Sequence, residues 1–211
     1  MKKVIVSMNV TLDGFMAGPN CELNWHFQRW TLDMAEHIGD QLSKADTILL
    51  GRITYNAMAR YWPAIAASVS IAREDIAFAE MMNNHTKIVF SKTLKQSDIT
   101  TTGWGNSKLA KKNISEEIGR LKKSHHPPEK DLIVFGSGQL VNSLMQSGLI
   151  DEYQLWIHPV VLGKGKSMFK PTLLRENEML KMKLIKTKTF SSGVILLSYE
   201  VQKNVSQLDP W

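Results

Sequence analysis

Cysteine is almost absent from this 211-residue sequence, which contains only Cys21. No internal disulfide can form, and a reducing, cytoplasmic location is expected. The histidines have no spacing typical of a metal site, so we expect no bound metal. No apolar run approaches the roughly 20 residues that a membrane span needs. No small-residue cleavage site follows the first residues either, so we predict neither a signal peptide nor a membrane partner.

The sequence also lacks a basic stripe interleaved with aromatic residues. Its formal net charge is +6, which suits an anionic ligand as well as nucleic acid. The lysines, however, mostly lie between apolar positions or near the ends of expected helices. We therefore interpret the positive charge as a solvated basic surface and expect no nucleic-acid partner. The apolar content of 43% and charged content of 22% are typical of an ordinary globular protein.

Short apolar segments rich in β-branched residues alternate with helical patterns over the first 160 residues. We expect strands at residues 4–10, 47–50, 87–90, 132–135 and 153–162. Trp30, Met34, Ile38 and Leu42 recur every four residues and predict one helix over residues 27–43. Residues 101–102 suit a short strand or sheet edge.

The C-terminal part of the sequence has a different pattern. Residues 181–189 and 194–201, separated by a turn at Gly193, predict an antiparallel hairpin. The whole pattern predicts a single three-layer α/β/α domain over residues 1–203, with a mostly parallel central sheet and this hairpin at its end. Residues 204–211 form a tail without a pattern.

Three expected strands end in glycine or in polar residues. The segments are Gly51-Arg52-Ile53-Thr54, Ser91-Lys92 and Gly136-Ser137-Gly138-Gln139. In an open α/β sheet, ligands bind at the carboxyl ends of strands, and a glycine turn before a helix directs free backbone N–H groups at an anion. Each segment alone is compatible with an ordinary turn, but together they predict an anion site. Their spacing is neither the dinucleotide glycine fingerprint nor a P-loop.

Four segments of the sequence resemble a known family. They are VSMNVTLDGFMAG, ADTILLGRITY, KIVFSKTL and the stretch from Asp131 to Phe169. Together they resemble the dihydrofolate-reductase-like superfamily, in the branch of the riboflavin-biosynthesis reductase domain and its stand-alone relatives. The resemblance spans roughly Lys3 to Val201. It implies the dihydrofolate-reductase-like fold and NADPH as cofactor.

The resemblance also implies a set of cofactor-binding residues. Arg52 would contact the adenosine 2′-phosphate. Thr54 and the glycine turn at residues 136–138 would contact the pyrophosphate. Trp25 would lie on the loop over the substrate. The full implied cofactor set is Asn9, Met16, Ala17, Gly51, Arg52, Thr54, Ser91, Lys92, Gly136, Ser137, Gly138, Gln139 and Leu140. Arginine is well suited to a phosphate, and glycine lets the backbone approach it.

Two departures from dihydrofolate reductase concern its substrate. Trp30 stands where that enzyme has the acid that protonates the pterin, and His85 aligns with the arginine that binds the folate glutamate. Dihydrofolate is therefore not expected as the substrate. Lys164 also replaces a glycine that relatives often have.

Few residues qualify as catalytic groups. Asp13 is the best candidate from the resemblance, although its Asp-Gly pair also suits a simple turn. Asp33 lies off the apolar stripe of its helix and is expected to face solvent. His158 lies in a strand and could face the substrate, or it could be a hydrogen-bonded core histidine.

These features predict an NADPH-dependent reductase of a small heterocyclic or carbonyl-bearing molecule. One alternative is the ribosylaminopyrimidine reduction of riboflavin synthesis, and another is a non-catalytic nucleotide-binding protein. The sequence contains no deaminase zinc motif. By analogy with the family and from the apolar hairpin, a homodimer is expected.

Overall fold

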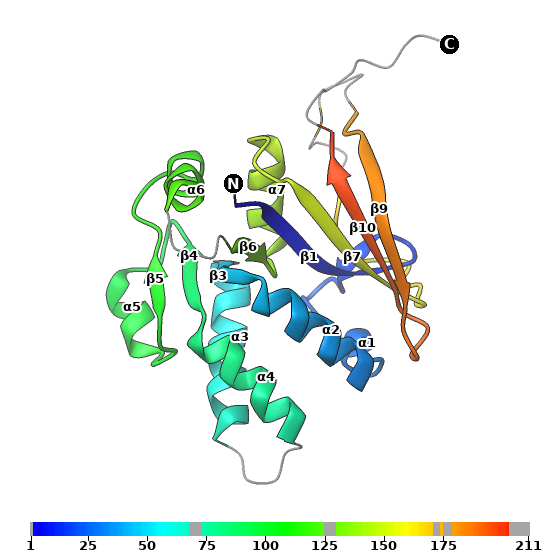
Figure 1. Cartoon of the computed structure of the whole chain (residues 1–211), viewed down its shortest axis with the longest axis horizontal. Coiled ribbons are helices and arrows are strands. Elements are labelled where there is room, and N and C mark those ends of the chain that lie inside the picture. Colours follow the sequence, from blue (N-terminus) through cyan, green and yellow to red (C-terminus); the bar gives the residue numbers. More distant parts are fainter. Residues whose placement is uncertain (1, 68–72, 125–129, 171–173, 175–178, 203–211) are drawn as a thin grey trace.

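The computed structural model describes residues 2–67, 73–124, 130–170, 174 and 179–202. An eight-stranded sheet lies between two layers of helices, with the strands in the order β5-β4-β3-β6-β1-β7-β10-β9 (Figure 1). Neighbouring strands are parallel from β5 to β7, and β10 is antiparallel to both β7 and β9. The predicted three-layer α/β/α architecture, with its mostly parallel sheet and C-terminal hairpin, is confirmed. The predicted tail, residues 204–211, lies outside the described residues.

The strands of the main sheet are β1 (Val4–Thr11), β3 (Ala45–Gly51), β4 (Thr86–Phe90), β5 (Ser107–Leu109), β6 (Asp131–Val134), β7 (Glu152–His158), β9 (Met182–Thr189) and β10 (Ile195–Val201). A small second sheet pairs β2 (Phe15–Ala17) with β8 (Lys166–Ser167). The helices are α1 (Asn24–Phe27), α2 (Leu32–Ser43), α3 (Arg52–Ala66), α4 (Arg73–Asn84), α5 (Gln96–Thr101), α6 (Ile114–Lys123) and α7 (Gly138–Gln146).

The two faces of the sheet bury separate apolar clusters, because alternate residues of a strand point to opposite faces. On one face, Val6 and Val134 pack with residues of α6 and α7. On the other face, Ile48 and Leu50 pack with residues of α2, α3 and α4. Figure 1 shows these two helical layers on opposite sides of the strands. The sheet is therefore covered on both faces over its parallel part, as a parallel sheet requires.

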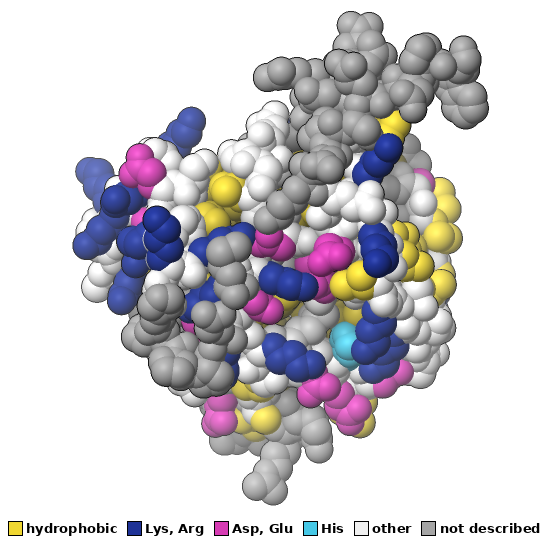
Figure 2. Space-filling view, turned by 45° about the horizontal axis from the view of Figure 1, so that its top comes forward, with side chains coloured by type: hydrophobic (Ala, Val, Ile, Leu, Met, Phe, Trp, Pro, Cys, Tyr) yellow, Lys and Arg dark blue, Asp and Glu magenta, His cyan; other side chains and the backbone are white. Residues whose placement is uncertain are grey.

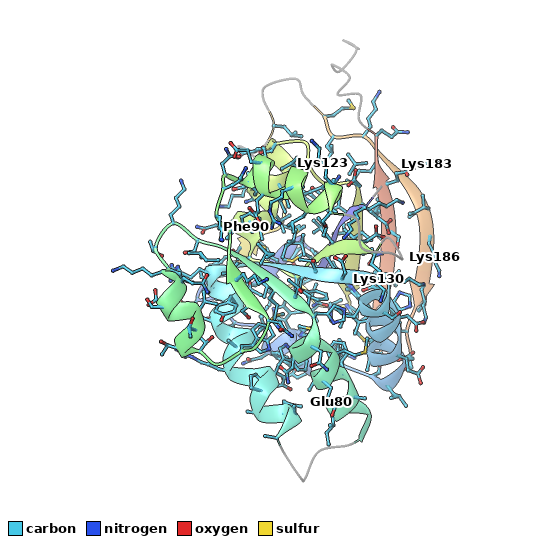
Figure 3. The ribbon with its side chains drawn as sticks, turned by 60° about the vertical axis from the view of Figure 1, so that its left-hand side comes forward. Glu80, Phe90, Lys123, Lys130, Lys183 and Lys186 are labelled. Carbon is cyan, nitrogen blue, oxygen red and sulfur yellow. The ribbon has the colours of Figure 1, made fainter. Side chains whose placement is uncertain are left out.

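The last two strands, β9 and β10, lie outside the part of the sheet that helices cover on both faces. Leu184 on β9 is 49% exposed and Ile195 on β10 is 39% exposed. Figure 2 shows lysine and arginine side chains interspersed with acidic ones over much of one face, and hydrophobic side chains gathered on the side where β9 and β10 lie. Lys183 and Lys186 lie along β9 at the edge of the sheet (Figure 3). Lysines on an edge strand discourage pairing with another strand.

Ion pairs tie the amino ends of the parallel strands together. Lys2, which is 3% exposed, pairs with Asp46 at the start of β3. Lys122, near the end of α6, pairs with Asp151 before β7, and the Asp151 carboxylate also accepts a hydrogen bond from the Val4 N–H at 2.9 Å. We call this group of contacts the amino-edge network. No helix in the described ranges is long and apolar enough to cross a membrane.

The helix predicted over residues 27–43 is wrong in its extent. The chain instead forms α1, then a break, then α2 beginning at Leu32. Thr31 is extended at the start of α2, and its hydroxyl donates a hydrogen bond to the Asp33 carboxylate at 2.5 Å. Threonine favours helix starts over helix interiors because its side chain competes for local hydrogen bonds.

Two predictions of strands are wrong as well. Residues 101–102 form the end of α5 and its cap, where the Thr101 hydroxyl donates to the Ser97 carbonyl at 2.8 Å and Asp98 accepts from the Lys95 N–H. The strand expected to reach residue 162 ends at His158, because Pro159 has no N–H to continue the ladder.

Candidate functional site

Adjacent parallel strands bring the residues predicted from the sequence to one edge of the sheet. In the strand order β4, β3, β6, β1, β7, these carboxyl ends carry Lys92, Arg52, Gly136–Gly138, Asn9 and His158, respectively. Ligands of open α/β sheets bind at this edge. The three polar segments singled out in the sequence are therefore neighbours in the structure.

The helices α3 and α7 begin side by side at this edge and form what we term the anion cradle, made of Gly51, Arg52, Ser137 and Gly138. The Gly51 N–H donates to the Gly136 carbonyl at 2.9 Å. A Cβ on Gly51 would lie 3.0 Å from the Ser137 backbone nitrogen and would overlap the Ser137 hydroxyl. Only glycine lets the two chain segments approach this closely.

The cradle leaves the first backbone N–H groups of both helices without local acceptors. No side chain in the described ranges caps α3 or α7, and neither helix has an acidic residue in its first turn. The contrast is α6, where the Asn113 side chain accepts from the Glu116 N–H at 3.0 Å and Glu116 and Glu117 occupy the first turn. The partial positive charges of α3 and α7 therefore remain available to a bound anion.

Two cations lie at the cradle, Arg52 within it and Lys92 just beyond Phe90, the residue of β4 that pairs with Gly51. Arg52 and Lys92 are both exposed, and neither forms an ion pair within the part of the chain that the structure describes. Ser91 has a local role, because its hydroxyl accepts from the backbone N–H groups of Thr93 at 3.1 Å and Leu94 at 3.0 Å. Thr54 packs against the glycine turn, its hydroxyl lying 2.9 Å from where a Gly136 Cβ would be.

The remaining predicted cofactor residues differ in how they could contact a ligand. The Met16 thioether lies over Gly138, where any Cβ would collide with it. Ala17 is buried beside Gly165, Gln139 is exposed, and Leu140 packs into the core. Leu140 can therefore offer only its backbone, whereas Met16 is a flexible side chain directly above the start of α7.

An aromatic cluster lies around the end of β7, which β1 separates from β6 and the cradle. It consists of Trp25, His26, Phe27, Trp30 and His158. The Trp25 and His158 rings are 5.0 Å apart and nearly perpendicular, and the His26 ring is 5.4 Å from that of His158. The His26 ring also lies 4.8 Å from the Phe27 ring and 5.7 Å from the Trp30 ring.

His158 is completely buried, and only one of its two ring nitrogens forms a hydrogen bond with a described residue. Its Nε2 donates to the Asn9 side-chain oxygen at 2.8 Å, whereas its Nδ1 has no hydrogen-bond partner among the residues that the structure describes. The Nε1 of Trp25 is also buried and has no hydrogen-bond partner in the described part of the chain. Burial lowers the pKa of both His26 and His158 to about 4, and the charges of His26 and Arg29 add to the effect at His158. Both imidazoles are therefore neutral at pH 7.

Asp13 and Asp33 are both held by neighbouring chain segments. Asp13 accepts from the Thr11 hydroxyl at 2.6 Å and from the backbone N–H groups of Leu162 and Gly163 at 3.0 and 2.7 Å. These bonds lower its pKa, which suits a charged anchor better than a proton donor, and its catalytic role stays a prediction. Asp33 does not simply face solvent as expected. It is half-buried and accepts from the Ser191 N–H at 2.9 Å.

Sequence reasoning missed His26 and Phe27 as members of the site. The available signal was the aromatic segment from Trp25 to Trp30, which places four rings within six residues after a glycine-proline loop. His85, at the position of the folate-binding arginine, forms hydrogen bonds to backbone carbonyls within the fold. Its ring nitrogens lie 2.6 Å from the Met81 carbonyl oxygen and 2.9 Å from that of Leu42.

Comparison with known proteins places this geometry in context. Residues 2–196 match the model of the RibD C-terminal domain. The chain is 34% identical over 198 residues to the uncharacterised protein YyaP of Bacillus subtilis, covering 94% of each chain. It is 25% identical to YwjB of the same organism over 92% of this chain and 96% of that one.

Solved structures share the fold at lower identity. A Shewanella sp. PV-4 protein, provisionally described as a riboflavin biosynthesis protein, superposes with a TM-score of 0.71 at 17% identity, over 95% of this chain and 99% of that one. A deaminase/5-amino-6-(5-phosphoribosylamino)uracil reductase of Thermotoga maritima superposes with a TM-score of 0.60 at 15% identity, over 95% of this chain and 57% of that longer chain. The resemblance read from the sequence is confirmed, and the chain belongs to the RibD C-terminal domain family.

Proposed function

We propose that the protein is an NADPH-dependent reductase that delivers a hydride to a small heterocyclic or carbonyl-bearing molecule. The anion cradle carries this proposal, because two helix starts that no described side chain caps converge at the carboxyl edge of the sheet, with Arg52 and Lys92, which form no ion pair with a described residue, at the same edge. A dinucleotide needs such a site for its pyrophosphate. The cations suit an additional phosphate on the adenosine ribose, which distinguishes NADPH from NADH.

The residues present fit the cofactor. Backbone N–H groups at the starts of α3 and α7 would hold the pyrophosphate, and Arg52 and Lys92 would hold the 2′-phosphate. Asn9 and Met16, at the β1 side of the cradle, would adjoin the nicotinamide. When bound, NADPH supplies the hydride, and the protein supplies binding and orientation. The aromatic cluster beyond Asn9 gives the substrate an apolar surface without a carboxylate.

Gly51→Ala tests the cradle with little disturbance of the backbone. Gly51 has φ −81°, which alanine adopts readily, so the new methyl group acts by pushing Ser137 away. We expect NADPH binding, measured by the change in nicotinamide fluorescence, to weaken about 10- to 100-fold, because losing one charge-assisted hydrogen bond from a displaced backbone N–H costs roughly 1.5–3 kcal/mol. Gly119→Ala is the matched control, because a Cβ there meets nothing within 4 Å. Unchanged NADPH binding by Gly51→Ala would exclude the cradle as the cofactor site.

Turnover is tested by following NADPH consumption with pterins, flavin precursors and small carbonyl compounds. The ribosylaminopyrimidine of riboflavin synthesis belongs in this panel, because the Thermotoga maritima relative carries that reductase activity in its name. Consumption with one class of acceptor identifies the substrate class. Binding of NADPH without consumption by any acceptor favours a nucleotide-binding protein and contradicts the reductase.

A further inference from the structure

The turn between β1 and β2 lies against the segment that follows β7. The Leu12 N–H donates to the Val160 carbonyl at 2.9 Å, and the Met168 N–H donates to the Gly14 carbonyl at 3.0 Å. The short strands β2 and β8 pair directly beyond this turn. Residues 160–168, which we call the clasped segment, are therefore bonded to the turn at both of their ends.

The carboxylate of Asp13 bonds the middle of the clasped segment. One of its oxygens accepts from the Leu162 N–H at 3.0 Å and from the Gly163 N–H at 2.7 Å, and the other accepts from the Thr11 hydroxyl at 2.6 Å. Successive backbone N–H groups that converge in this way favour a negative charge. The hydrogen bonds, that from Thr11 first, lower the pKa of Asp13. The carboxylate is therefore charged at neutral pH, which is the form that its three donors need.

Met16 is the extra residue of a β-bulge between β2 and β8. Phe15 pairs with Ser167. Ala17, two positions further along β2, pairs with Lys166, only one position back along β8. A bulge of this kind bends its strand and re-aims a side chain. The pairing of β2 with β8 therefore sets the direction of the Met16 side chain.

The thioether of Met16 rests on the anion cradle. A Cβ on Gly138 would overlap both the methyl carbon and the sulfur of Met16, so the two residues are in direct contact. Strands of three and two residues are too short to hold this arrangement alone. Gly165, within the clasped segment, packs so closely on β2 that a Cβ there would collide with the Ala17 carbonyl oxygen. The position of β8, and with it that of Met16, thus depends on how the clasped segment is held.

We propose that Asp13 is a positioning residue, which holds Met16 against the anion cradle by fixing the clasped segment and β8. Its carboxylate acts on the ligand site through this chain of contacts, and its bonds keep it charged rather than ready to donate a proton. The consequence for NADPH binding rests on the proposed function, whereas the effect on the position of Met16 does not.

The methyl resonance of Met16 reports its position directly. In the full chain labelled at the methionine methyl groups, Met16→Leu identifies this resonance by its loss. Asp13→Ala, a change at an exposed position, should shift the Met16 resonance and leave the other methionine resonances in place. Asp13→Asn should keep the resonance near its wild-type position, because the amide oxygen can accept from Leu162 and Gly163 while the amide nitrogen donates to Thr11. An unshifted resonance in Asp13→Ala would overturn the proposal.

Asp33 provides the matched control, because it forms the same kind of bonds elsewhere. Its carboxylate accepts from the hydroxyl of Thr31, two positions earlier, at 2.5 Å and from the Ser191 N–H at 2.9 Å. Ser191 lies between β9 and β10, outside the clasped segment. Asp33→Ala should therefore leave the Met16 resonance unchanged. A shift as large as that caused by Asp13→Ala would indicate a general loosening of the fold and contradict the specific role.

A double-mutant cycle on NADPH binding tests whether Asp13 acts through Met16. Asp13→Ala and Met16→Ala should each weaken NADPH binding about tenfold, the scale of losing part of the buried contacts of one methionine. The double variant should bind NADPH no more weakly than Met16→Ala alone. Additive losses, about a hundredfold in total, would mean that Asp13 acts by another route. A wild-type chain that does not bind NADPH would refute the proposed cofactor, and the Met16 resonance would still decide the role of Asp13.

The Asp13→Asn variant separates positioning from proton donation. With the acceptor that the NADPH-consumption panel identifies, it should retain most of the wild-type kcat, because asparagine keeps the bonds but cannot replace an acid. Removing a general acid typically costs about 10²- to 10⁴-fold in rate. A loss of kcat on that scale, with the Met16 resonance at its wild-type position, would make Asp13 the proton donor and overturn the proposal.

Discussion

Arg52 should decide which nicotinamide cofactor the protein prefers. It is the first residue of α3, it is exposed, and it forms no ion pair in the described part of the chain. NADPH and NADH differ at this position by one phosphate. A charge-assisted hydrogen bond from arginine to that phosphate contributes roughly 1.5–3 kcal/mol. Arg52→Ala should therefore weaken NADPH binding about 10- to 100-fold and leave NADH binding nearly unchanged.

The assay is a titration of both nucleotides against wild type and variant, at low and at high salt. The preference for NADPH should shrink as salt is raised, because exposed charges are screened. Arg60→Ala is the matched control, since Arg60 is another exposed arginine of α3, about 12 Å further along the helix axis. Lys92 stands beside the cradle and could share the phosphate, so the Arg52→Ala/Lys92→Ala double variant should show the full loss.

Equal weakening of NADPH and NADH by Arg52→Ala would refute this reasoning, because it would mean that arginine supports the helix and not the phosphate. An effect of Arg60→Ala as large as that of Arg52→Ala would do the same. It would show that general positive charge along α3, and not one specific contact, draws the nucleotide to the protein.

Three further outcomes are expected. Dihydrofolate should not be reduced, because Trp30 and His85 replace an acid and an arginine; NADPH-dependent turnover of dihydrofolate at about one per second or faster would contradict this. The free energy of unfolding should fall as the pH drops from 6.5 towards 4, because unfolded His26 and His158 bind protons that the folded chain excludes. The loss is about 2 kcal/mol per histidine at pH 5. Urea denaturation of His26→Gln should show a smaller fall in the free energy of unfolding over the same pH range. Light scattering should give twice the monomer mass of 23.9 kDa, and Leu184→Lys on the exposed face of β9 should shift the measured mass towards that of the monomer. A wild-type monomer at micromolar concentration would count against the dimer.

The sequence predicted the parallel strands and the cradle because both depend on local signals. A buried strand is a short run of apolar residues, and the glycine turns at Gly51 and Gly136 follow two such runs directly. The resemblance to the family indicated Trp25 and Asn9 as candidate site residues. These parts needed no knowledge of long-range contacts.

Other features depend on contacts that the sequence does not display. The break before α2 arises because Thr31 is extended and bonded to Asp33, although the apolar spacing continues across it. α5 forms at a threonine-rich segment because its side chains bond locally and Ile99 is buried. The hydrogen bond that fixes the proton on His158 Nε2 comes from Asn9, which lies 149 positions earlier in the chain.

The amino-edge network has a consequence for how members of this family can diverge. Its ion pairs hold the strands at the end of the sheet opposite the cradle and the aromatic cluster. Residues facing the ligand can therefore change without loosening the attachments that keep the strands in register. Under the proposed function, a scaffold anchored in this way could exchange one substrate for another through a few substitutions around Trp25 and His158, while the anion cradle and the opposite edge stay as they are.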